Sequence, residues 1–287
     1  MGGYVIKYFV LVLLCILVGI KSTAQIITAD DDFDEKRFML NVKDIGEFID
    51  RFNDAPNSSF RVEVKKMYPS LNITRKQVLT ILFGKRNKSW NNADTAKFVS
   101  EICNPTKPQY LDFKAGNWYA KVLCVFRYKN RRQIIPLILK TSYNPATNSV
   151  VWIISGLVWN ESFKDTLDLK PLPATSVSNR FIPASNYATN FTGLAVIFEN
   201  SRELPANLSG DLVKSKAAAY FMKHLQAGSL KFIAIQSVRY YFFQVANWFF
   251  TVDDEGDSDM HSGWLISALK RINGKDKSTY TQKILAQ

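Results

Sequence analysis

Apolar residues recur at helical spacing soon after residue 40. They are Val42, Ile45, Phe48, Ile49 and Phe52. This pattern predicts a helix capped by Asn41. Thr74 and Gln77 have the spacing of a capping box and predict a second helix, which ends at Gly84. A third, weaker helix is expected over 94–103.

The pattern then changes to the alternation of β-strands. Residues 118–128 alternate along their whole length and predict a long strand. Residues 133–140 predict a second strand, in which Pro136 favours an edge position or a bulge. Residues 150–159 are apolar on both faces, so we expect this strand near the middle of the sheet. Helices followed by an antiparallel meander indicate an α+β fold.

A similar order of elements returns later in the chain. Residues 161–187 contain three prolines among Ser, Thr and Asn and read as a linker. Helices are then predicted over 191–198 and 211–227. One or two long strands are predicted over 230–252, and a last strand over 263–272.

Two short matches indicate an internal duplication. The sequence Trp-Ile-Ile-Ser-Gly-Leu at 152–157 corresponds to Trp-Leu-Ile-Ser-Ala-Leu at 264–269. Residues 41–45 and 190–194 correspond more weakly. The second copy is expected to lack a strand equivalent to 133–140.

This element order resembles the cystatin-like cone of the nuclear-transport-factor-2-like superfamily, over 38–160 and less completely over 188–273. The resemblance rests on element order alone, and it would make the chain an exported bacterial protein with two such domains in tandem. The fold expected is α+β, with two cystatin-like units whose helices pack on a curved antiparallel sheet. The expected organisation is a signal peptide 1–24, a first domain 25–160, a linker 161–187, a second domain 188–273 and a polar tail 274–287.

The first 24 residues have the features of a cleavable secretory signal. An apolar run over 8–20 is shorter than the roughly 20 residues of a spanning helix. Small residues at Ser22 and Ala24 place cleavage before Gln25, and an uncleaved anchor is the alternative. We therefore expect export to the periplasm, the cell surface or the medium, with no integral membrane span after cleavage.

The chain is basic, with a net charge of +12 that falls to +10 when Lys7 and Lys21 leave with the signal. For an exported protein this charge favours an envelope or extracellular protein, a glycan or an anionic surface over nucleic acid. The basic patch most worth testing lies between two predicted strands. It consists of Arg127, Lys129, Arg131 and Arg132. A solvated face is the simpler reading.

Candidate catalytic residues are few, and no cofactor is expected. Some members of the superfamily are isomerases or dehydratases that place an acid, a Tyr or a His inside an apolar cone. His224 lies on the apolar stripe of a predicted helix, and Tyr240 and Tyr241 fall on opposite faces of a strand. The simpler reading is a partly buried histidine near a helix C-terminus for His224 and ordinary core packing for the tyrosines.

Two further features have open interpretations. An acidic cluster suggests either a Ca²⁺ site or a solvated hairpin tip. Its candidate ligands are Asp253, Asp254, Asp257 and Asp259. Cys103 and Cys124 remain after signal cleavage, and they either form a disulfide or stay free.

Two functions are compatible with these observations. The first is a non-enzymatic exported module that binds or assembles partners at the cell envelope. The alternative is a small-molecule pocket protein, with isomerase- or lyase-like chemistry in one of the cones. This alternative requires a deep apolar cavity with one or two converging polar groups.

Overall fold

The computed structural model of the protein describes residues 41–84, 90–144, 148–159, 181–256, 262–274 and 276–285. The signal peptide expected at 1–24 lies outside the described residues, as do the linker residues 161–180 and the side chains of Asp257 and Asp259. Residues 41–287 form one compact unit. The fold described below is that of this unit.

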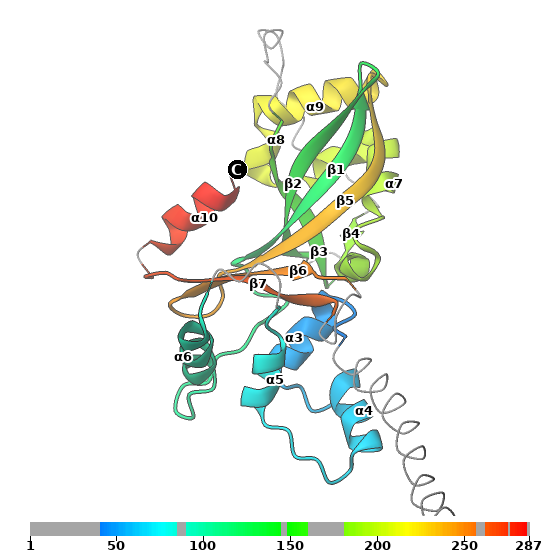
Figure 1. Cartoon of the computed structure of the whole chain (residues 1–287). Helices are drawn as coiled ribbons and strands as arrows, with labels where there is room; N and C mark the ends of the chain where they lie inside the picture. The colour runs from blue at the N-terminus through cyan, green and yellow to red at the C-terminus, as the bar shows by residue number, and fades with distance from the viewer. Residues whose placement is uncertain are drawn as a thin grey trace, which may run out of the picture. The chain divides into compact units, whose positions relative to one another are not determined.

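Seven strands form one curved, unclosed antiparallel sheet in the order β4-β3-β2-β1-β5-β6-β7 (Figure 1). The strands are β1 Trp118–Tyr128, β2 Arg131–Asn144, β3 Ser149–Leu157, β4 Ile182–Pro183, β5 Leu230–Phe242, β6 Trp248–Asp254 and β7 Trp264–Arg271. The strands expected in two separate units thus share one sheet, because β1 pairs with β5 along its whole length.

Helices precede each half of the sheet. Those before β1 are α3 Ile45–Asn53, α4 Ser59–Met67, α5 Arg75–Ile81 and α6 Asn92–Ile102. Those before β5 are the 3₁₀ helices η2 Ala184–Thr189 and η3 Ser201–Asn207, with α7 Leu194–Glu199, α8 Gly210–Val213 and α9 Lys216–Gln226. Helix α10, Lys277–Leu285, follows β7 and lies within the expected polar tail.

The core joins the helices of each half to strands of the other half. Phe48 on α3 and Phe98 on α6 pack on Phe250 of β6, with ring centroids 6.3 and 5.7 Å apart. Phe198 on α7 packs on Phe126 of β1 at 5.3 Å. In Figure 1, α3 to α6 lie beside β6 and β7, whereas α7 to α9 lie beside the long strands β1, β2 and β5. Burial of these aromatic rings is the main source of stability for such a fold.

A single continuous row of paired residues crosses the sheet from one side to the other. Ala120 on β1 and Tyr240 on β5 are direct partners, and each continues to an equivalent neighbour on its other side. The row reads Leu208, Ile154, Leu139, Ala120, Tyr240, Val252, Ile266 and Phe83. Strand β6 therefore occupies the place that β2 has in the first half, so the expectation that the second half lacks this strand was wrong.

Strands β3 and β7 also share a β-bulge at the matching serines. Ser155 is the extra residue of β3, and Ser267 is the extra residue of β7. The Ser155 hydroxyl donates to the carbonyl oxygen of Ile138 at 3.2 Å. The Ser267 hydroxyl lies 2.8 Å from the hydroxyl of Thr251, which occupies the place of Ile138. In both bulges, the hydroxyl of the extra serine therefore forms a hydrogen bond with a residue of the neighbouring strand.

Local signals in the sequence located several elements correctly. Strand β1 begins and ends where the alternation predicts. The capping box of Thr74 and Gln77 is formed at the start of α5. By contrast, the edge position or bulge expected at Pro136 is not found, because β2 lies between β1 and β3 and Pro136 pairs with Leu123 of β1 without a register shift. Its carbonyl oxygen accepts the N–H of Val158 at 3.0 Å.

Three further expectations were wrong. The cap of the first helix is Asp44, whose carboxylate accepts the N–H of Glu47 at 2.9 Å, and not Asn41. The helix expected over 211–227 is divided, because Ser215 caps a new helix, α9. Strand β3 lies beside the short β4 and not near the middle of the sheet. Helix α4 was not expected from the sequence at all.

Candidate binding surfaces

The predicted basic patch lies at the tip of the β1–β2 hairpin. Lys129 and Asn130 form its two-residue turn with φ values of 47° and 63°, the positive values of a type I′ turn. Arg127 lies directly opposite Arg132 on β2 and directly opposite Lys231 on β5. The tip thus brings the predicted residues together on exposed positions and adds Lys231, which only the strand register reveals.

Positive charge at this tip is not neutralised by the described part of the chain. Within it, no carboxylate forms an ion pair with Arg127, Arg131 or Arg132. The ammonium of Lys129 lies 4.9 Å from the ring centroid of Tyr128. Like charges directly opposite each other destabilise a sheet. Repulsion among these cations therefore destabilises the tip, and an anionic partner would relieve this repulsion.

His224 lies beneath the same tip, near the end of α9. Its Nδ1 is 2.7 Å from the hydroxyl oxygen of Ser229, and its ring packs against Tyr220 and Tyr128 at 4.4 and 5.0 Å. The side chain is half-buried. These surroundings are those of a packed helix-terminal histidine.

Tyr240 points into the main core, away from His224. It is completely buried, with its ring 5.0 Å from Trp264 and 6.0 Å from Trp118. Its hydroxyl has no hydrogen-bond partner among the described residues. Burial raises the pKa of Tyr240 well above its usual value, and the nearby Asp44 and Tyr187 raise it further. Aromatic rings thus occupy the space around this candidate.

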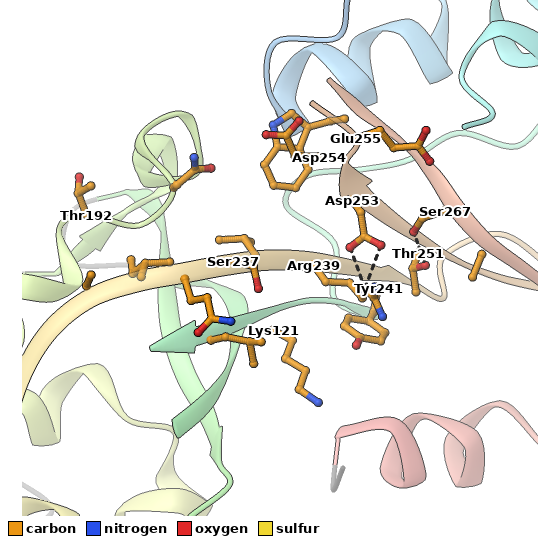
Figure 2. A pocket seen from close by; sticks show the side chains of 18 of the residues that line it. Lys121, Thr192, Ser237, Arg239, Tyr241, Thr251, Asp253, Asp254, Glu255 and Ser267 are labelled. Carbon is orange, nitrogen blue, oxygen red and sulfur yellow. Dashed lines mark hydrogen bonds and ion pairs between the residues drawn. The ribbon is translucent and has the colours of Figure 1, made fainter. Parts of the chain in front are cut away.

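A groove of about 1050 Å³ follows β5 (Figure 2). Its lining comes from four strands and from the segment that leads into α7. The residues on which the site depends are Lys121, Thr192, Ile233, Ser237, Arg239, Tyr241, Thr251, Asp253, Asp254 and Ser267. Tyr241 therefore faces this groove, opposite to Tyr240, as strand alternation requires.

A row of charges crosses the groove. Lys121 on β1 lies opposite Arg239 on β5, and Arg239 lies opposite Asp253 on β6. The Arg239 Nε donates to both carboxylate oxygens of Asp253, at 2.7 and 3.0 Å, and this bond raises the pKa of Arg239. Burial, followed by the charge of Arg239, lowers the pKa of Lys121. Burial also raises the pKa of Tyr241.

The acidic cluster is only partly described. Asp253 pairs with Arg239, and a carboxylate oxygen of Asp254 accepts the N–H of Gly256 at 3.0 Å. Asp257 and Asp259 lie outside the described residues. Among those that are described, no three His, Cys, Asp or Glu side chains are placed to hold a metal ion. The Ca²⁺ site remains a prediction.

Cys103 and Cys124 are free thiols in this structure. Cys124 is buried on β1, and Cys103 is half-buried at the end of α6. Burial raises the pKa of both thiols, far more for Cys124. Neither has the low pKa of a reactive cysteine.

Within the described part of the chain, no helix has both the length and the hydrophobicity required to cross a bilayer. Comparison of the chain with protein-family models, curated proteins and solved structures found no match. The function is therefore inferred from the residues and surfaces of this chain.

Proposed function

We propose that the protein is a non-enzymatic, exported binding or assembly module of the cell envelope, and that its basic hairpin contacts an anionic surface. The observation that carries the proposal is the row Arg132–Arg127–Lys231, three cations on adjacent strands with no neutralising carboxylate among the described residues. Lys129 adds a fourth charge in a turn conformation that residues other than glycine rarely adopt. Binding an anion would relieve the repulsion within the row.

The test compares two variants that remove the same number of charges. The hairpin variant replaces Arg127, Lys129, Arg131 and Arg132 by Gln. The control replaces four exposed lysines elsewhere, which are Lys65, Lys66, Lys97 and Lys107. The probes are immobilised heparin and vesicles with or without phosphatidylglycerol.

We expect salt-sensitive binding of the wild type and the control to the anionic probes, and its loss in the hairpin variant. Binding should weaken between about 0.1 M and 1 M salt, as the Debye length falls from ~10 to ~3 Å. Equal loss in both variants would mean that only net charge matters. Absence of salt-sensitive binding by the wild type would reject the proposal.

Export is the second part of the proposal and is supported by the sequence of residues 1–24. Secretion of the full-length chain should give a protein whose first residue is Gln25. Deletion of residues 1–24 should retain it in the cytoplasm. An extracytoplasmic protein that still begins at Met1 would favour the uncleaved anchor.

We also propose that the chain arose by duplication of one cystatin-like unit. The matching Trp–Ser sequences of β3 and β7, the symmetric pairing row and the equivalent bulges at Ser155 and Ser267 support this origin. Because helices of each half cover strands of the other, fragments 41–159 and 181–287 should unfold without cooperativity when alone and associate when co-expressed. A fragment that folds by itself would argue for two independent domains.

A further inference from the structure

The two sides of β5 are paired to very different extents. Strand β1 pairs with β5 from residue 230 to residue 242. Strand β6 pairs with it only over 239–242. Along 231–238, no strand of the described residues occupies the second side of β5. The backbone N–H and C=O groups that point to this side form a free sheet edge.

The side chains of this edge offer little protection against pairing. Its sequence is Lys-Phe-Ile-Ala-Ile-Gln-Ser-Val, with no proline and with a charge only at Lys231. Ile233 is 47% exposed, and Ala234, Gln236 and Ser237 are also exposed. Natural proteins usually protect edge strands by charges, prolines, bulges or covering segments. A long, apolar and exposed edge is therefore an interaction surface.

Besides the charge of Lys231 and the packing of Phe198 from α7 on Phe232, β5 carries two bulges. Ile233 and Gln236 have no partner on β1, because the register skips each of them. Both line the groove, so the bulges present their side chains to it. Thr192 and Asp254, both labelled in Figure 2, line the groove. The free edge of β5 thus faces a channel that both residues line.

We propose that this channel binds an extended peptide segment of a partner protein, which adds to the sheet as a new strand along residues 232–238. Main-chain hydrogen bonds from the peptide to the free edge would provide affinity, and contacts between the peptide's side chains and Ile233 would provide selectivity. The two surfaces share Lys231, but the hairpin variant leaves Lys231 unchanged, so either proposal can fail alone.

Charge complementarity indicates the composition of the segment. The free edge begins at Lys231, beside Arg127 of the hairpin tip. Near its other end the groove is lined by the exposed Asp254, whereas Asp253 there is already paired with Arg239. The segment that fits carries an acidic residue at one end, a basic residue at the other and β-branched residues between them.

The probe is the synthetic peptide Lys-Thr-Val-Thr-Val-Thr-Val-Glu, used together with its reversed sequence to cover both strand directions. A matched peptide carries N-methyl groups on the three valine nitrogens, which removes backbone donors and keeps the side chains. Binding is followed by fluorescence anisotropy. Hydrogen exchange of residues 232–238 reports whether the edge amides are covered.

We expect saturable binding of one direction, at least tenfold slower exchange at the edge, and loss of both with the N-methylated peptide. The variant Ile233→Lys should weaken binding at least tenfold. Val62→Lys, a similar change at an exposed apolar position on α4, should not. The N-methyl comparison uses the wild-type protein and does not depend on the folding of a variant.

Three results would overturn the inference. One is equal binding of the N-methylated peptide, which would show that side chains alone mediate contact. Another is unchanged edge exchange with both peptides, which would mean that the bulges close the edge. The third is a dimer by light scattering that Ile233→Lys dissociates, which would make a second copy the occupant.

Discussion

Tyr240 lies at the centre of the pairing row, and its hydroxyl is a polar group buried among aromatic rings. The side chain is 0% exposed, and its hydroxyl has no hydrogen-bond partner among the described residues. A buried polar group without a partner costs about 1–3 kcal/mol. Replacing Tyr240 by Phe removes the hydroxyl and keeps the ring that packs on Trp264.

The expected result is a more stable protein. If the substitution recovers about 1 kcal/mol, the melting temperature of a chain of this size should rise by roughly 2–4 °C. Urea unfolding followed by tryptophan fluorescence should show a higher midpoint at an unchanged m-value.

Tyr128 provides the matched control, because it is a second buried tyrosine on a central strand. Its hydroxyl lies 3.1 Å from that of Tyr220. Tyr128→Phe removes this hydrogen bond and should destabilise the protein by about 0.5–1.5 kcal/mol. The reasoning is refuted if Tyr240→Phe also destabilises by about 1 kcal/mol or more, since the Tyr240 hydroxyl must then have a partner, such as a buried water.

Three further measurements test other parts of the fold. Phe98→Ala removes a ring that packs on four other aromatic residues and should cost about 3–5 kcal/mol in urea unfolding; a loss below about 1 kcal/mol would contradict this packing. Burial raises the pKa of Cys124 more than that of Cys103, so less Cys124 thiolate is present at pH 8. A thiol reagent should therefore modify Cys103 first. Rapid modification of both thiols in the folded protein would contradict the burial of Cys124. Ser155→Ala and Ser267→Ala should each cost about 0.5–1.5 kcal/mol if the two bulges are equivalent, and a large effect of only one would argue against equivalence.

The sequence by itself determined the local elements and the faces of the strands. The alternation over 118–128 located β1, and the spacing of Thr74 and Gln77 located the start of α5. It also identified the cations of the hairpin and the matching sequences around Trp152 and Trp264. These features depend on neighbours within a few positions along the chain, and spacing records such neighbours directly.

Only the tertiary structure decided which strands are neighbours. Alternation shows which face of a strand is buried, but it does not identify the strand that pairs with it. The pairing of β1 with β5 joined the halves into one sheet, placed Lys231 beside Arg127 and set Lys121 opposite Arg239. Because β6 pairs with β5 only over 239–242, one side of β5 has no partner strand along 231–238 among the described residues. The groove along β5 and the place of Lys231 beside the hairpin therefore arise from contacts between residues far apart in the sequence.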